Sequence, residues 1–319
     1  MKRAAMAVGV AVLAIGSAST GHAQQQIQWK QVYNMPKGAN QPKGISLDIL
    51  GIELGDTYAE AKAKLEKLAA EYAAPPKPQA PPQAVNPSSL AQMDAAMLGT
   101  MDGLNRREQD MLSGVSNRPP LSEQKTIIRY QTPGGIISAE YVGQITMRRE
   151  IPNGNAKISE IIDVHFSAPS SGAQVFAVKR DLSYNNGEQA PVAQVVQILK
   201  DKMRAEAQMV EVTKNVYRYQ YDGGRLVAFN PPTPRGECTA LFVGTQTRSA
   251  LKNVNANGVC DIMFETNFTF GISTNHARRI EFFLSDQERA KNNKEADYAY
   301  VESYIRDLQS QSKGTAPKL

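Results

Sequence analysis

The sequence predicts an α+β protein made of two modules, each with a helix and an antiparallel sheet, followed by a C-terminal helix. Three observations favour this class. A helical spacing of apolar residues is followed by short strand-like runs, this order occurs twice, and a third helical stretch closes the chain. We expect the first module over 44–184, with a flexible Pro/Ala-rich insertion over 74–120, and the second over 185–310.

The N-terminal residues 1–23 have the parts of a secretory signal peptide: a basic start, an apolar stretch and small residues before Ala23. Because the apolar stretch is shorter than the roughly 20 residues that span a bilayer, it predicts a cleaved signal rather than a membrane anchor. Cleavage after Ala23 would give a periplasmic or secreted protein without a stable transmembrane segment. A polar arm of low intrinsic order is expected over 24–43, where Trp29 can pin it to the body.

The first module opens with a strand, a tight turn and a helix. Residues 47–54 form an apolar run broken by Gly51, which predicts a short buried strand. Thr57 and Glu60 have the spacing of a capping box, in which each side chain bonds a backbone N–H at the start of a helix. The apolar residues of that helix share one face: Ala61, Leu65, Leu68 and Tyr72.

The insertion over 74–120 begins with proline and alanine, a composition that tends toward an extended spacer. Beyond the spacer we expect an amphipathic helix with Met93, Met97 and Met101 on one face. Methionine adapts to irregular surfaces, so these residues are candidates for partner binding. The alternative is that the helix packs onto its own sheet.

Strand-like runs fill the rest of both modules. They span 126–131, 138–150, 158–167 and 174–184 in the first module, and 216–221, 225–229, 239–245, 259–270 and 277–284 in the second. Pro191 suits the first position of a helix that carries an apolar stripe from Val192. Ser285 and Glu288 repeat the capping-box spacing and open the C-terminal helix, and a disordered tail is expected over 311–319.

The two cysteines of the chain are Cys238 and Cys260. Two cysteines in an exported protein predict one disulfide, which would stabilise the fold by roughly 3 kcal/mol in the chain-entropy model. Removal of Lys2 and Arg3 with the signal lowers the formal charge from +5 to +3. Nucleic-acid-binding proteins usually show clustered basic charge, so this balance argues against a nucleic-acid partner.

Few residues offer catalytic chemistry. The sequence has no phosphate loop, dinucleotide glycine pattern, nucleophile elbow or paired-histidine helix, and no metal or cofactor is expected. Strand alternation places Asp163 and His165 on one face, where a carboxylate beside an imidazole can act as a general base. The alternative is a solvent-facing pair stabilised by charge. His276 is expected in a surface turn.

Three tyrosines, Tyr217, Tyr219 and Tyr221, alternate on one face of a predicted strand. They suit a partner-binding surface of amphipathic rings or, alternatively, the half-buried side of a sheet under a helix.

Residues 50–57, Leu-Gly-Ile-Glu-Leu-Gly-Asp-Thr, lead into Glu60 and Leu65 and resemble the strand–glycine–Thr–helix opening of an envelope module. That module is the one of the outer-membrane-assembly lipoprotein BamE (SmpA/OmlA-like) and of other bacterial exported proteins. This chain has Asp56 where the family usually has Met, and it lacks the lipidated cysteine. The tandem layout is also similar to that of secreted β-lactamase inhibitors, and both resemblances imply non-enzymatic protein binding.

The sequence therefore favours an exported, non-catalytic protein that binds another protein or an envelope component. The alternative is a hydrolase that acts on cell-wall or surface polymers through His165 and a nearby carboxylate.

Overall fold

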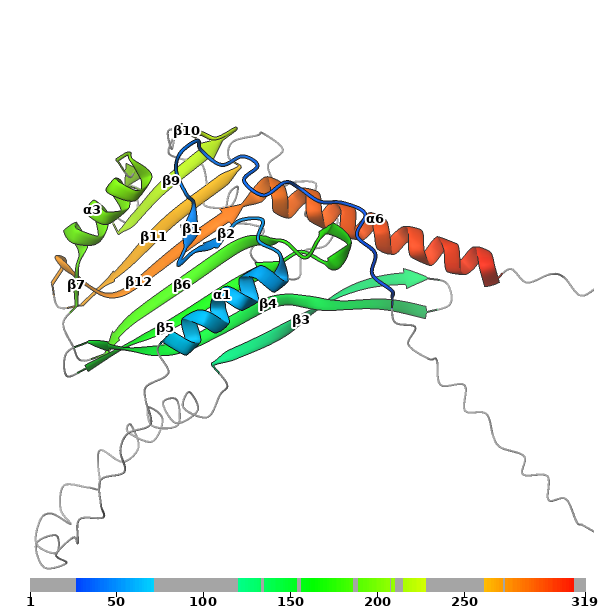
Figure 1. Cartoon of the computed structure of the whole chain (residues 1–319), viewed down its shortest axis with the longest axis horizontal. Helices are drawn as coiled ribbons and strands as arrows, with labels where there is room; N and C mark the ends of the chain where they lie inside the picture. Colours follow the sequence, from blue (N-terminus) through cyan, green and yellow to red (C-terminus); the bar gives the residue numbers. More distant parts are fainter. Residues whose placement is uncertain are drawn as a thin grey trace, which may run out of the picture.

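The computed structural model describes residues 27–71, 120–132, 135–153, 156–185, 189–206, 208–209, 215–227, 261–271 and 273–312. These residues form an α+β structure dominated by one antiparallel sheet (Figure 1). The helical elements are α1 (Tyr58–Glu71), α3 (Val192–Met203), α6 (Gln287–Ser312) and the 3-10 turn η1 (Pro169–Ser171). None of the described helices is both long enough and apolar enough to cross a bilayer.

The sheet has ten strands within the described residues, in the order β10-β9-β11-β12-β6-β5-β4-β3, with β7 beside β12 and β8 beside β9. The strands of the first half are β3 (Leu121–Thr132), β4 (Gly135–Asn153), β5 (Ala156–Phe166) and β6 (Val175–Asn185). Those of the second half are β7 (Ala190–Pro191), β8 (Gln208–Met209), β9 (Val216–Asp222), β10 (Arg225–Val227), β11 (Ile262–Phe270) and β12 (His276–Asp286). A separate small hairpin pairs β1 (Asp48–Ile49) with β2 (Ile52–Glu53).

Both predicted modules contribute to this single sheet. The last strand of the first, β6, pairs antiparallel with the last strand of the second, β12, from Ser183↔Arg279 to Ala177↔Ser285. In the first half the chain runs from α1 to the edge strand β3 and then inward through β4 and β5 to β6, and the second half ends by passing from the edge strand β10 through β11 to the central β12. The α+β class is thus confirmed, and one continuous sheet dominates it.

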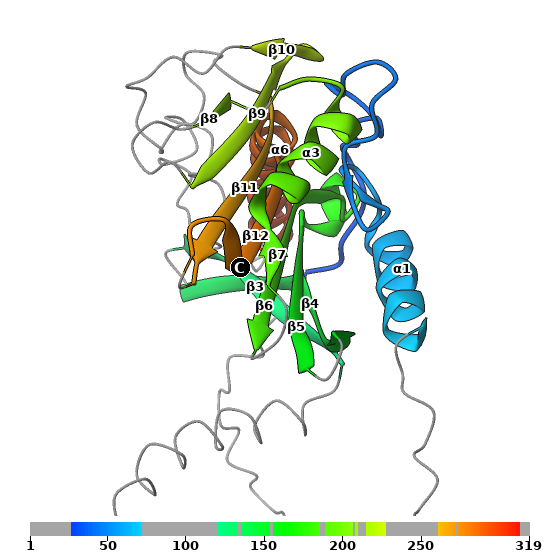
Figure 2. The same ribbon diagram turned by 90° about the vertical axis from the view of Figure 1, so that its left-hand side faces the viewer.

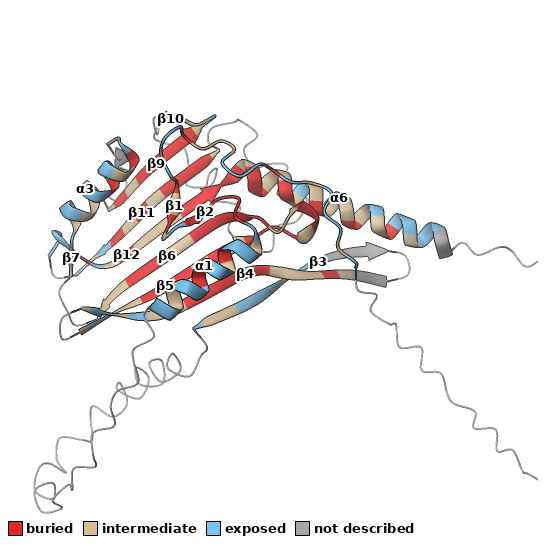
Figure 3. Cartoon of the chain, viewed as in Figure 1, coloured by how far each residue is buried: buried red, intermediate tan, exposed pale blue. Residues whose placement is uncertain are grey.

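One face of the sheet is covered by the β1–β2 hairpin, α1 and α3. Figure 2 shows the sheet nearly edge-on with α1 on one side of it. Leu54, Leu65 and Met203 are fully buried and belong to one apolar core with residues of β4, β5, β6, β9, β11 and β12. Figure 3 shows that buried residues run along the central strands of the sheet. Ala61 and Leu65 face this core, as their helical spacing predicts.

The helix α6 packs against the β3–β4 hairpin and the start of the arm. Val301 and Ile305 are buried against Ile128 and Ala139 of the β3–β4 hairpin and Ile27 of the arm. Trp29 lies in the same cluster, where its indole N–H donates to the carbonyl of Glu140 at 3.0 Å and its ring stacks on Tyr300 at 5.8 Å between centroids. The arm is therefore pinned by Trp29, and 27–43 lies along the body without regular secondary structure.

The two predicted capping boxes have different outcomes. At α1 the box is confirmed, because Thr57 N–H donates to Glu60 at 2.7 Å and Glu60 N–H donates to the Thr57 hydroxyl at 3.3 Å. At α6 the predicted Ser285–Glu288 box is wrong. The helix is capped instead by Asp286, which accepts from the backbone N–H of Arg289 at 2.8 Å. Glu288 bonds the side chain of Asn40 in the arm.

Several predicted segments lie outside the described residues. These are the signal peptide 1–23, most of the insertion 74–120, the strand 239–245 and the end of the tail. The boundary of the tail is corrected, since α6 continues to Ser312 instead of ending before 311.

Candidate functional site

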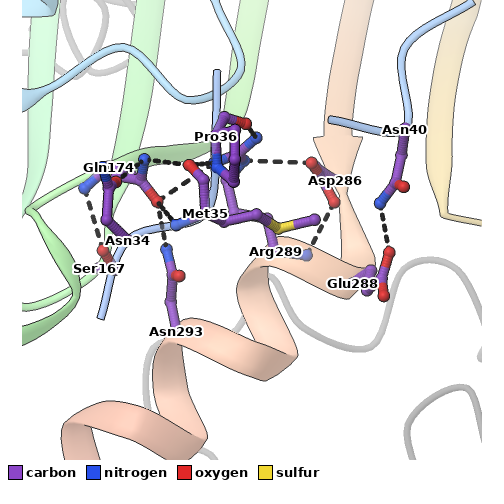
Figure 4. A network of polar contacts seen from close by, with 10 residues as sticks. All are labelled: Asn34, Met35, Pro36, Asn40, Ser167, Gln174, Asp286, Glu288, Arg289 and Asn293. Atoms are coloured by element: carbon purple, nitrogen blue, oxygen red, sulfur yellow. Dashed lines mark hydrogen bonds and ion pairs between the residues drawn. The ribbon is translucent and has the colours of Figure 1, made fainter. Parts of the chain in front are cut away.

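The arm is held on the body by a buried polar network that begins at Arg289 (Figure 4). The guanidinium of this fully buried residue donates to the carbonyls of Met35 and Pro36, each at 2.9 Å, and forms an ion pair with Asp286 at 3.1 Å. Gln174, just before β6, donates to the carbonyl of Met35 at 2.7 Å. Buried polar groups that lose their partners destabilise a fold by about 1–3 kcal/mol each, so this network fixes the path of the arm.

Asp56 extends the same attachment to α1. Its side chain is fully buried and forms ion pairs at 2.6 Å with Lys37 of the arm and with Lys64 of the helix. Burial raises the pKa of this carboxyl, but hydrogen bonds from Lys37 and Lys64 outweigh it and hold the pKa below its ordinary value. Asp56 thus joins the arm to α1.

Gly55 is required next to this attachment for two reasons. Its φ of +86° lies in the left-handed region that side chains disfavour. A Cβ at this position would also lie 3.1 Å from the guanidinium of Arg289.

Beyond the network, the arm forms one wall of a pocket with a volume of about 520 Å³. The other walls are the end of α3 and the β9–β10 hairpin. The lining residues are Gln41, Pro42, Lys43, Ile45, Met203, Arg204, Ala205, Tyr221, Gly223, Gly224, Arg225 and Leu226. The volume lies within the range of about 300–1,000 Å³ that is typical of small-molecule sites.

Close backbone contact joins the arm to the hairpin at this pocket. Gly224 has a φ of +75°, and a Cβ there would lie 2.9 Å from the carbonyl oxygen of Gln41. The turn Asp222-Gly223-Gly224, which the sequence predicts, therefore also provides the space for the arm. At the wall formed by the end of α3, the helix ends on Arg204, which takes the left-handed conformation with a φ of +51°.

Two of the three predicted binding tyrosines form part of the core beneath the pocket. Tyr219 and Tyr221 are each 1% exposed, and their hydroxyls donate to the carbonyl of Ala205 at 3.2 Å and to the sulfur of Met203 at 3.9 Å. Tyr217 packs edge-on against Phe268, with 5.6 Å between ring centroids. The prediction of an exposed partner-binding surface is therefore wrong for Tyr219 and Tyr221. These two residues instead belong to the side of the sheet that a helix covers.

Positive charge dominates the polar part of the pocket. Lys43, Arg204 and Arg225 are exposed, and none of the three forms an ion pair with another described residue. The described lining contains no carboxylate. Arg225 is the cross-strand partner of Asp222, which offsets its charge. The pocket therefore combines an apolar floor with two cations, Lys43 and Arg204, that have no acidic partner among the described residues.

The predicted pair Asp163 and His165 lies elsewhere, on the opposite face of the sheet. Asp163 accepts from the hydroxyl of Thr146 at 2.6 Å and from the amide of Gln144 at 2.9 Å. Burial beside Phe176 lowers the pKa of His165 to about 4, and the attraction of Asp163 opposes this shift only in part. His165 is therefore neutral at pH 7 and a weak base.

Other predicted residues carry no further site. His276 is exposed at the start of β12, as expected. Met93, Met97, Met101, Cys238 and Cys260 lie outside the described residues, so their partner-binding and disulfide roles stay predictions. Within the described residues, no cluster of three or more His, Cys, Asp or Glu side chains has the arrangement of a metal site.

Sequence reasoning missed the pocket because its cations come from three separate segments. Lys43, Arg204 and Arg225 are ordinary surface residues in the sequence, and only the glycine turn beside Arg225 marked the place. Comparison with known proteins assigns no family: no family model, no curated protein and no solved structure matches this chain.

Proposed function

We propose that this chain is an exported, non-catalytic protein that binds another protein or an envelope component. The observation that supports it most is the pocket between the arm, α3 and the β9–β10 hairpin. Its described lining offers cations, an amide and apolar side chains, which suit binding, and no carboxylate, imidazole or thiol. A periplasmic or secreted location follows from the predicted signal peptide and belongs to the same proposal.

The chemistry around His165 favours binding over hydrolysis. An efficient general base has a pKa near the working pH, whereas the pKa of His165 is lowered to about 4. Asp163, the carboxylate on the same strand face, is bonded to Thr146 and Gln144. A hydrolase would need these residues to change partners before they could act on a substrate.

The two-module division is the finer part of the fold proposal. In the first half α1 precedes the sheet strands β3–β6, in the second half α3 follows β7 and precedes β8–β12, and the two innermost strands, β6 and β12, run antiparallel. Two similar modules joined at β6 and β12 would give a stiff platform. Such a platform would hold the pocket walls in place before a partner binds, which reduces the free energy lost to ordering.

The test compares charge reversals in the pocket with charge reversals elsewhere. The tagged chain is expressed with its leader, and material that co-purifies from envelope extract is quantified by mass spectrometry. The double variant Lys43→Glu/Arg204→Glu should lose its co-purifying component. The matched variant Lys67→Glu/Arg278→Glu changes exposed cations away from the pocket and should keep it.

His165→Ala separates the two functions. The binding protein should retain its co-purifying component, and digestion of cell-wall polymer should be absent from both chains. Polymer digestion by the unmodified chain that disappears in His165→Ala would replace the proposal with the hydrolase alternative.

A further inference from the structure

We infer that the pocket takes a small amphipathic anion, in which a phosphate or carboxylate group is joined to an apolar chain. This inference rests on the proposed binding function and names the class of ligand for the same site. It follows from the sign of the charge in the pocket, from the position of the apolar lining and from the available volume.

The sign of the charge favours an anion. The guanidinium of Arg204 lies close to the segment that follows the arm, 3.6 Å from the place of a Cβ on Gly44. Lys43 immediately precedes Gly44, and Lys43 and Arg204 both line the pocket, so two cations border the same space. The C-terminus of α3 adds a negative charge of about half a unit, which only partly offsets these two cations.

The apolar lining lies directly beside these cations. Tyr221 and Leu226 are cross-strand partners in the β9–β10 hairpin, so their side chains share one face. Tyr221 is buried, whereas Leu226 is 42% exposed and is one of four large hydrophobic side chains exposed in the described part of the chain. An exposed leucine next to a floor of Met203, Ile45 and Tyr221 suits contact with an apolar group of a ligand.

The volume allows both parts of such a ligand to bind together. A space of about 520 Å³ exceeds what a bare phosphate or carboxylate fills. A free inorganic anion would leave the apolar floor uncovered, and a neutral apolar ligand would leave Lys43 and Arg204 without a counter-charge. An amphipathic anion satisfies both regions.

The experiment titrates the full mature chain by calorimetry with octyl phosphate, below the concentration at which it forms micelles. One-to-one binding that weakens as NaCl is raised is expected, because exposed charges are screened by salt. Arg204→Gln and Lys43→Gln should each lower the affinity by about tenfold, the loss of one charged hydrogen bond. The matched variants Arg278→Gln and Lys67→Gln should leave it unchanged.

Further ligands and one further variant test separately the charged group and the apolar chain of the ligand. Octanoate should bind like octyl phosphate, whereas inorganic phosphate and the neutral octyl glucoside should bind at least about tenfold more weakly. Leu226→Asn should weaken the binding of octyl phosphate and leave the binding of inorganic phosphate unchanged. Equal binding of inorganic phosphate would overturn the apolar part of the inference, and equal binding of octyl glucoside would overturn the anionic part.

Thermal unfolding of every variant checks that the fold is retained. Absence of octyl phosphate binding at millimolar concentration would overturn the inference. If the pocket-dependent co-purification persists in that case, the binding function stands and only the ligand class fails. If co-purification also fails to depend on Lys43 and Arg204, both proposals fail.

Discussion

The arm crosses two polar regions that differ in how completely their charges are paired. Around Arg289 and Asp56, buried charges meet opposite charges or carbonyl oxygens at 2.6–3.1 Å. A few residues further along the arm, Lys43 lines the pocket together with Arg204, which follows α3. Both are exposed beside an apolar floor, and neither has an acidic partner among the described residues. Paired charges hold the arm in place, whereas the second group remains available to a ligand. The attachment of the arm and the proposed binding site therefore involve neighbouring but separate residues.

Removal of Arg289 should give the largest effect. Arg289→Ala leaves Asp286 as a buried charge and removes the donors to Met35 and Pro36, so the free energy of unfolding should fall by about 3–5 kcal/mol. Urea denaturation measures this loss. The exposed Arg278→Ala is the control and should change stability by less than about 0.5 kcal/mol. Similar small losses in both variants would show that the network does not hold the arm.

Substitution of Gly55, the glycine beside Arg289, should cause the second-largest loss of stability. Gly55→Ala introduces both backbone strain and a contact of 3.1 Å with the guanidinium. Gly38→Ala is the matched variant, because Gly38 has a similar φ of +81° and nothing within 4 Å of its Cβ position. Both should lose about 1 kcal/mol from strain, and Gly55→Ala should lose about 1–3 kcal/mol more from overpacking. Equal losses would contradict close packing at Gly55.

Titration of His165 should lower the stability of the fold as the pH falls. Because burial lowers the pKa of His165 from 6.5 to about 4, its stabilising contribution is present above pH 6.5 and is lost as the pH falls toward 4. His165→Gln should therefore lose less stability than the unmodified chain between these pH values. Asp297 acts in the opposite direction, since burial raises its pKa to about 6, but both chains retain it. Parallel pH profiles for the two chains would contradict the lowered pKa of His165.

The smallest effect on stability is expected in the pocket. Lys43→Gln removes an exposed charge that has no described ionic partner, so the free energy of unfolding should change by less than about 0.5 kcal/mol. The same variant should bind octyl phosphate more weakly. A large loss of stability would mean that Lys43 belongs to the attachment of the arm and not to a binding site.

Local patterns were predictable from the sequence where the partners lie close together. The Thr57–Glu60 box needs only four residues and is confirmed. The Ser285–Glu288 box fails because the adjacent Asp286 caps the helix and also pairs with Arg289. The other partners of Arg289 are Gln174, 115 residues away, and two carbonyls of the arm, 253 and 254 residues away. Spacing along the chain carries no information on such distant partners.

The candidate site was less predictable for the same reason. The alternation of Tyr219 and Tyr221 gave their common face but left open whether a helix covers it, and the answer depends on the packing of α3. Lys43 and Arg204 become neighbours only after the arm lies against the end of α3. The lysine partners of Asp56 also follow only from the fold.

The pairing of β6 with β12 has a consequence for the newly made chain. Its register joins residues about a hundred positions apart, and the last of the described strands, β12, occupies the centre of the sheet. Until β12 is complete, the N-terminal half ends in an uncovered β6 edge, whose free N–H and C=O groups can pair with another chain. A nascent or truncated molecule that stops before His276 is thus a template for self-association, and protection of that edge is a requirement for productive folding.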